Sequence, residues 1–358
     1  MKIVFLIYFL FLQAGLKGQI PVYDYVEFEP SLMVPESINR ERTAVVVHVP
    51  DRTGSYKEVG DWRQIAEEAH RAFVKMGIDA VFYLNHYALE GEISKNNYKE
   101  LFDSRRIKNI IFITEGDLGV ELLMCQYSGT SAFLSPGNPV FYLQKQKMDD
   151  LLLQTGKEIR RANLSNENFL IPEKPNYIGG ISIVEKSVLK NYPGILRRSR
   201  LVVERFSKLS VPSGSDGKIK QKIDAYNKNI ENKNATLVKL MEGYPYDYEL
   251  IDPVSDEDLL RRRYQFVLRS VSGQASIVRE MFDLDTPDSE ALYVSTIPVM
   301  PDQTLAKPIS RDALVYKFYI RQNISKNIHI GVWDADITWE AALRNMLGNL
   351  IQQHNISK

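Results

Sequence analysis

The sequence predicts an α/β protein, α+β overall, built from two domains. In its N-terminal half, apolar runs of strand length alternate with amphipathic segments of helix length. This pattern predicts a three-layer βαβ domain with a mostly parallel sheet. In its C-terminal half, two similar segments alternate with period 2, and a helical stripe closes the chain. This second pattern predicts a smaller α+β domain with antiparallel hairpins and a C-terminal helix.

The first apolar run, residues 44–49, is stopped by Pro50, and a polar loop with glycines follows it. Residues 61–76 then carry apolar side chains at steps of three and four, and Gly77 is the expected residue just after a helix. A second apolar run, residues 78–84, completes the unit. Strand, helix and strand in about 40 residues predict a βαβ crossover whose parallel strands are buried on both faces.

The rest of the first domain extends this sheet. We expect a helix, a third buried strand, two strands at an antiparallel edge and a second helix, at residues 94–106, 107–114, 120–127, 140–144 and 148–162. A loop-rich stretch with Pro172 and Pro175 follows and marks a domain boundary. The sequence therefore predicts an α/β domain over residues 43–175.

Residues 176–358 form the predicted α+β domain. A long surface helix is expected over residues 218–241, because its apolar residues recur at helical spacing among many Lys and Asn. Residues 264–269 resemble residues 316–321, which indicates either a duplicated hairpin or two similar strands. The closing helix, residues 338–353, carries an apolar stripe that we expect in the core, with an exposed partner-binding face as the alternative.

The N-terminus predicts export. Residues 1–18 combine Lys2 with a short apolar run, which is typical of a signal peptide cleaved between Gly18 and Gln19. Residues 19–42 follow as a proline-punctuated arm. No later apolar run is long enough for a transmembrane segment. With Cys125 as the single cysteine, no internal disulfide is possible. These features predict a soluble bacterial protein of the periplasm or the extracellular space.

Composition excludes one class of partner. The chain has 358 residues with 45 Lys and Arg against 45 Asp and Glu, so its formal net charge is zero. A neutral chain without a dominant basic stripe lacks the electrostatic footprint of a nucleic-acid binder, and we predict no nucleic-acid partner.

No established catalytic or cofactor motif is present, so the candidate site depends on position alone. In an open parallel sheet, ligands bind outside the carboxyl ends of the strands. The residues expected at those ends are Asp51, His86, Glu115 and Asp117. Carboxylates beside a histidine can hold a divalent cation or act as acid and base. The alternative is that these polar residues only cap helices and solvate loops.

The other histidines have simpler interpretations. His48 lies inside an apolar strand and is expected to be a hydrogen-bonded core residue, while His70 and His354 are expected to be solvated. No catalytic residue and no cofactor beyond the possible cation is predicted.

Export, two domains and the lack of a catalytic signature favour a non-catalytic binding or assembly component of the cell envelope, with an envelope protein as its partner. The first alternative is a periplasmic hydrolase, or an enzyme that binds a small ligand or a metal with the strand-end acids. A second alternative, solute binding, requires a cleft between the domains.

Overall fold

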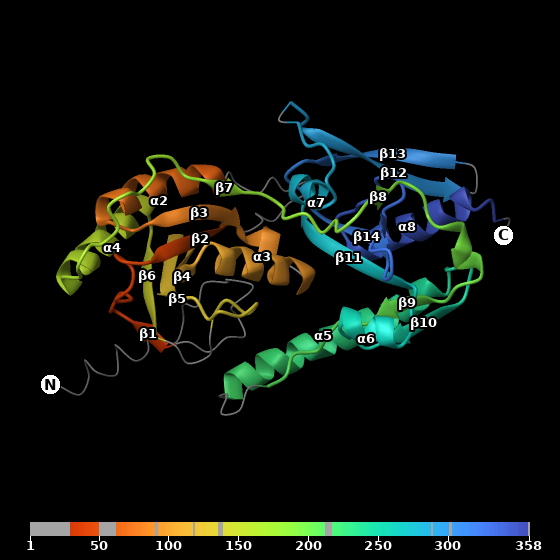
Figure 1. Cartoon of the computed structure of the whole chain (residues 1–358), viewed down its shortest axis with the longest axis horizontal. Coiled ribbons are helices and arrows are strands. Elements are labelled where there is room, and N and C mark those ends of the chain that lie inside the picture. The colour runs from red at the N-terminus through yellow and green to blue at the C-terminus, as the bar shows by residue number, and fades with distance from the viewer. Residues whose placement is uncertain are drawn as a thin grey trace.

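The computed structural model describes residues 29–49, 62–89, 92–116, 119–134, 139–211, 217–287, 289–300 and 303–356. The predicted signal peptide, residues 19–28 of the arm, Asp51 and Asp117 lie outside these residues. Within them the chain mixes helices with parallel and antiparallel sheets and ends in a helix, which confirms the predicted fold class (Figure 1).

The first sheet has seven strands in the order β1-β6-β5-β4-β2-β3-β7. Its strands are β1 (Glu29–Ser31), β2 (Arg42–His48), β3 (Ala80–Asn85), β4 (Ile107–Gly116), β5 (Gly119–Gln126), β6 (Pro139–Lys145) and β7 (Tyr177–Ile178). Its helices are α2 (Trp62–Met76), η1 (His86–Leu89, a 3₁₀ turn), α3 (Glu92–Ser104) and α4 (Met148–Ala162). β2 is parallel to β3 and β4, whereas β5 is antiparallel to both of its neighbours.

The predicted βαβ unit is present as β2, α2 and β3. Val45 and Val47 face the α2 and α4 side of the sheet, and Ala44 and Val46 face the other side, so the central strand is buried on both faces. α2 ends as the sequence predicts. The Ile78 N–H donates to the Phe73 carbonyl and the Gly77 N–H to the Val74 carbonyl, which is a Schellman ending that requires positive φ at Gly77.

A second sheet follows, with the order β10-β9-β11-β14-β15-β8. Its strands are β8 (Val188–Leu189), β9 (Leu201–Glu204), β10 (Tyr248–Ile251), β11 (Phe266–Gln274), β14 (Leu314–Gln322) and β15 (Ile328–His329). The helices of this part are η2 (Gly194–Arg197), α5 (Gly217–Met241), α6 (Asp256–Arg261), α7 (Ala275–Met281) and α8 (Trp339–Gln353). The strands β12 (Leu292–Met300) and β13 (Gln303–Ser310) form a separate hairpin.

The C-terminal helix belongs to the core. Leu343, Met346, Leu347 and Leu350 of α8 are all buried in one cluster with residues of β9, β11 and β14. Thr338 caps the helix, because its side chain accepts a hydrogen bond from the Ala341 N–H. The apolar stripe is therefore a packing surface, which confirms the core interpretation.

The two segments that resemble each other are neighbours in the second sheet. β11 and β14 pair antiparallel along their whole length, with Phe266 opposite Gln322 and Gln274 opposite Leu314. The helix α7 follows β11, whereas the short strand β15 follows β14. The resemblance thus describes two adjacent strands with similar burial, set in different local surroundings.

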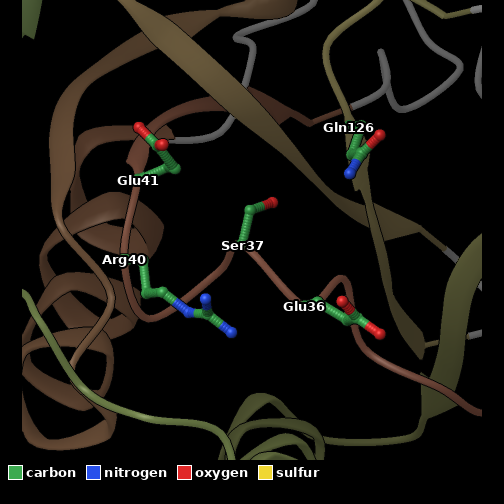
Figure 2. Close-up of a pocket in the computed structure, with 5 residues that line it drawn as sticks. All are labelled: Glu36, Ser37, Arg40, Glu41 and Gln126. Atoms are coloured by element: carbon green, nitrogen blue, oxygen red, sulfur yellow. The ribbon is translucent and has the colours of Figure 1, made fainter.

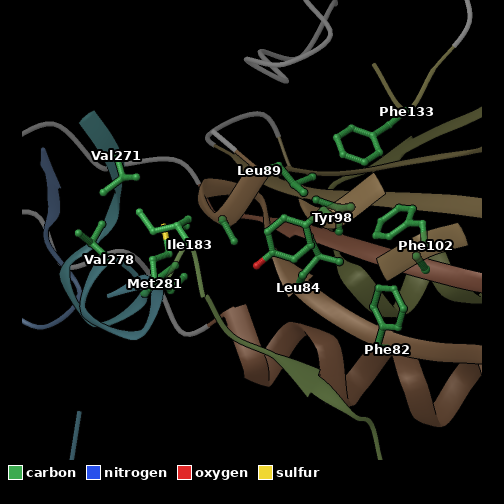
Figure 3. Packing of buried hydrophobic residues seen from close by; sticks show 14 of the residues in the cluster. Phe82, Leu84, Leu89, Tyr98, Phe102, Phe133, Ile183, Val271, Val278 and Met281 are labelled. Atoms are coloured by element: carbon green, nitrogen blue, oxygen red, sulfur yellow. The ribbon is translucent and has the colours of Figure 1, made fainter. Parts of the chain in front are cut away.

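Both sheets share one apolar core. Leu84, Leu89 and Tyr98 of the first part pack in the same cluster as Val271 and Val278 of the second (Figure 3). The Asn85 side chain also donates to the side-chain oxygen of Gln274 at 3.0 Å. The described residues of the two parts are therefore packed together along this junction.

The helix α5 projects from the second part and carries an extended strap, residues 205–211, along one side (Figure 1). Two asparagines hold the strap. The Asn234 side chain accepts from the Phe206 N–H and donates to its carbonyl, and Asn227 does the same with Leu209. Each amide thus replaces one rung of a β-ladder, which satisfies the strap's backbone away from any sheet. None of the described helices is long and apolar enough to cross a bilayer.

The ending of α2 generates a stability prediction. Replacing Gly77 by Val forces a β-branched residue to positive φ and brings its Cβ within 2.8 Å of the Asn39 Nδ2, which otherwise donates to the Met76 carbonyl. Gly129 also has positive φ but has open space around it. We expect Gly129→Val to lower the free energy of unfolding by about 1–3 kcal/mol and Gly77→Val to lower it further.

Urea denaturation of both variants measures the difference. An equal loss in the two variants would show that the close approach to the Asn39 and Asn166 side chains contributes nothing.

Candidate functional site

The structure separates the predicted site residues that it describes. His48 is opposite Thr114 in the register of β2 and β4, so Glu115, the next residue, projects to the other face of the sheet. His86 follows β3 and its ring contacts His48 at a centroid distance of 4.7 Å. His86 and Glu115 therefore lie on opposite faces, and they are not brought together. Asp51 and Asp117 belong to the residues outside the description.

Glu115 has acidic neighbours. Burial raises the pKa of Glu68, and the nearby carboxylates of Asp149 and Glu115 raise it further, while Arg71 lowers it. Glu68 belongs to α2 and Asp149 to the first turn of α4, so the helices bring these carboxylates to one end of the sheet. Within the described part of the chain, no three His, Cys, Asp or Glu side chains gather where they could share a metal ion. Cation binding that uses Asp51 or Asp117 stays a prediction.

His48 is buried, with 2% of its surface exposed, and its ring stacks edge-on against His86 and Tyr87. Neither ring nitrogen of His48 has a hydrogen-bond partner among the described residues, which differs from the expected hydrogen-bonded core histidine. Burial lowers the pKa of His48 from 6.5 to about 4. The neutral ring is therefore the form that the folded chain holds at neutral pH.

Two other histidines were wrongly expected in solvent. His70 is buried, with one ring nitrogen 3.0 Å from the Tyr83 hydroxyl and the other 2.9 Å from the Pro172 carbonyl. His354 is buried too, and its Nδ1 lies 2.7 Å from the Tyr246 hydroxyl. In both cases distant segments cover a polar position of a helix, which helical spacing alone does not reveal.

The position of the predicted site is partly covered by the second half of the chain. Asn85, at the carboxyl end of β3, binds Gln274, and the Tyr87 carbonyl lies 3.2 Å from the place of a Cβ at Gly273. The turn η1 therefore lies close to the end of β11, and a side chain at Gly273 would require the Tyr87 carbonyl to shift. Along β3, the strand end serves for packing between the two halves.

Two hollows of the described surface lie near the opposite, amino-terminal ends of the parallel strands. One has a volume of about 200 Å³, and Figure 2 shows the polar side chains around it. They are Glu36, Ser37, Arg40, Glu41 and Gln126. A neighbouring hollow of about 240 Å³ shares Glu36 and Gln126. Both volumes are below the roughly 300–1,000 Å³ of a typical small-molecule site, and neither hollow contains a histidine or cysteine.

A buried ion pair lies inside the second part. The Lys317 Nζ is 2.6 Å from Asp334 Oδ1 and 2.6 Å from the Ile330 carbonyl oxygen, and both side chains are fully buried. Asn349 donates to the second carboxylate oxygen at 2.9 Å. Burial raises the pKa of Asp334, although Lys317 and Asn349 act in the opposite direction. The groups that contact Lys317 and Asp334 all belong to this part of the fold, so the ion pair fixes the packing of the residues beneath α8.

The β12–β13 hairpin exposes apolar side chains on one face of a regular two-stranded sheet. Tyr293, Ser295 and Ile309 point inward and are buried. On the other face, Leu292 and Val294 are 57% and 58% exposed, and Ala306 and Pro308 beside them are exposed as well. We call these four residues the outer face of the hairpin. In an antiparallel sheet with one wet side, that side is normally polar.

Sequence analysis missed this surface. Prolines at 298 and 308 obscured the strands, because proline argues against a central strand. The hydrophobic pattern also favours the wrong face, since Ser295 is buried while Leu292 and Val294 are exposed. The usable signal was the combination of β-branched and aromatic residues with prolines, which is typical of an edge strand.

No protein-family model matches the chain, and a search of curated proteins returns no match.

The first prediction from this site concerns pH. Because the pKa of His48 is about 4 in the folded chain and 6.5 is its usual value, the unfolded chain binds a proton first as pH falls. The contribution of His48 to stability is complete above pH 6.5 and is lost between pH 6.5 and 4. The shift corresponds to about 3 kcal/mol.

Comparison of wild type with His48→Phe isolates this contribution, since His70, His329 and His354 titrate in both. Chemical denaturation at several pH values between 7 and 4 should give a flatter stability profile for the variant. Parallel profiles would contradict the proposed titration.

The second prediction concerns the buried ion pair. Lys317→Met leaves Asp334 as an unpaired buried carboxylate, and we expect it to cost about 3–5 kcal/mol of unfolding free energy. The double variant Lys317→Met/Asp334→Leu removes both charges and should cost less than either single change. Denaturation of all three variants tests this, and a double variant as unstable as the sum of the two would contradict it.

Proposed function

We propose that this chain is an exported component of a bacterial cell-envelope assembly, and that it binds a partner protein without catalysing a reaction. The observation that carries the proposal is the outer face of the β12–β13 hairpin, where Leu292 and Val294 are more than half exposed on one strand, next to Ala306 and Pro308 on the other. Contiguous exposed apolar side chains typically mark interaction sites.

The inner face explains why the outer face is rigid enough to bind. Ser295 donates to the Ala335 carbonyl at 2.6 Å, and the Lys307 Nζ lies 2.7 Å from Asp336 Oδ1. The helix α8 also contacts the end of the hairpin, because a Cβ at Gly348 would meet the ring of Pro298. The apolar side chains are therefore held in place before a partner arrives, which reduces the entropy that binding costs.

The chemistry of this face selects the partner class. It has no charged side chain, so its complement is an apolar protein surface. Withdrawing Leu292 and Val294 from water contributes on the order of 1 kcal/mol each. Export rests on residues 1–18, whose pattern is that of a signal peptide.

The test is made in cells that carry the full chain with a C-terminal tag. N-terminal sequencing of the envelope fraction should find a mature chain that begins near Gln19. Native size separation of the same fraction should find the chain in an assembly larger than two copies of itself. The double variant Leu292→Glu/Val294→Glu should leave that assembly, because each carboxylate would have to be buried against an apolar surface.

Ile324→Glu is the matched control. Ile324 is 73% exposed in the turn between β14 and β15, away from the hairpin in sequence. Both variants should melt at the wild-type temperature, and the control should stay in the assembly. Retention of the hairpin variant, or a wild-type chain that migrates alone, would contradict the proposal.

A further inference from the structure

The strand β13 lies at the margin of the molecule, and among the described residues it pairs with β12 only (Figure 1). One row of its backbone groups therefore faces away from the hairpin. Such an edge accepts another strand unless charges, prolines, bulges or a covering element block it, and of these devices β13 itself has one proline, Pro308.

The pairing of β12 shows which groups of β13 face outward. The Thr296 N–H donates to the Trp333 carbonyl at 2.7 Å, and the Thr296 carbonyl accepts from Asn349, so both groups point away from β13. Thr296 is opposite Ala306 in the antiparallel register. In such a pair both residues direct their backbone groups outward, so those of Ala306 point to the free edge. Thr304 and Pro308, two residues away on either side, do the same.

This geometry accounts for both prolines of the hairpin. Pro298 is opposite Thr304 and Pro308 is opposite Val294, which are pairs of the same outward type as Thr296 and Ala306. Their missing N–H groups therefore cost the hairpin no hydrogen bond. On the free edge, Thr304 and Ala306 offer both a donor and an acceptor, whereas Pro308 offers only its carbonyl.

The edge also lacks the charge that usually protects one. Lys307 is the only charged residue of β13, and its Nζ is bound inward to Asp336 at 2.7 Å. The outward-facing positions are Thr304, Ala306 and Pro308, none of which is charged. Two such edges can approach each other without like-charge repulsion.

We propose that β13 pairs antiparallel with β13 of a second copy of this chain, about a two-fold axis at Ala306. In this register each Ala306 N–H donates to the Ala306 carbonyl of the other copy, and each Thr304 N–H donates to the other copy's Pro308 carbonyl. The carbonyl left without a donor, that of Thr304, lies at the rim, where the exposed Thr304 keeps it in water. The edge is thus complementary to itself, as a two-fold interface requires.

The dimer joins the two hairpins into one sheet, with an α8 helix beside each β12 and both outer faces on the same side. This interface uses the backbone of β13, whereas the partner surface proposed above uses side chains of both hairpin strands. Ala306 and Pro308 belong to both surfaces, so Leu292→Glu/Val294→Glu, which changes β12 alone, is the substitution that separates the two proposals.

Sedimentation equilibrium of the mature chain, from about 1 to 500 μM, tests the dimer. We expect wild type to be a reversible dimer in the upper part of that range. Ala306→Lys should be monomeric at low salt, because two lysines then face each other at the axis, and should recover part of the association in 1 M salt. Ala306→Pro should be monomeric at every salt concentration, because it removes the central donor.

Two further variants are expected to keep the dimer. Pro308→Ala restores the missing donor in both copies and should lower the dimer dissociation constant about tenfold. Leu292→Glu/Val294→Glu should stay dimeric, because both residues lie on β12, away from the axis. Amide hydrogen exchange should find the Thr304 and Ala306 N–H groups protected at high protein concentration and unprotected at low concentration.

Each of several outcomes would overturn the proposal. These are a wild-type chain that is monomeric throughout the range, an Ala306→Pro variant that is folded and still dimeric, and association without protection of Thr304 and Ala306. Loss of the dimer in Leu292→Glu/Val294→Glu would place the interface on the outer face instead. Thermal melting of every variant confirms that a monomeric result comes from a folded chain.

Discussion

The two sheets of this protein depend on one apolar core that both of them share. Phe82 and Leu84 of β3, Tyr98 of α3, and Val271 of β11 belong to a single buried cluster, and Val278 of α7 closes it (Figure 3). Neither half can withdraw its part of this cluster from water without the other, because each sheet has apolar residues on the face that meets its neighbour. The junction therefore sets which surfaces of each half remain available.

That constraint explains what the residues at the carboxyl ends of the strands contact. In an open parallel sheet they form the usual ligand crevice, yet here Asn85 binds Gln274 and η1 packs against Gly273. The polar groups at the end of β3 thus serve the junction. Glu115 lies across the sheet from this contact, beside Glu68 and Asp149. The hairpin, which exposes Leu292 and Val294 on a regular strand, lies far along the chain from those strands.

Buried polar groups determine how precisely the second half is ordered. Lys317 and Asp334 satisfy each other, and Asn349 carries the contact from the carboxylate to the helix α8. The same asparagine also holds β12, because it donates a hydrogen bond to the Thr296 carbonyl. One side chain thereby links the ion pair, the helix and the hairpin. This linkage holds α8 and β12 at fixed positions relative to the ion pair.

The local pattern of apolar residues was sufficient to predict the elements in which the buried positions recur with the period of a strand or a helix. The apolar run at 44–49 predicted β2, the stripe and Gly77 predicted α2 and its ending, and residues 148–162 predicted α4 with the same bounds. In these segments most apolar residues are buried, and the exceptions, such as exposed Leu153 and buried His70, are few enough that the sequence alone determined type and position.

Tertiary structure decided the site. The strand order and register place His86 and Glu115 on opposite faces, and nothing in the residues around either one indicates this. His70 is covered by the Pro172 segment, more than a hundred residues away along the chain, and the hairpin exposes Leu292 while it buries Ser295. The physical reason is the same in each case. The spacing of apolar residues along a segment shows which of its faces can be buried. Whether a polar group is buried or an apolar one is exposed depends on which distant segment packs against it.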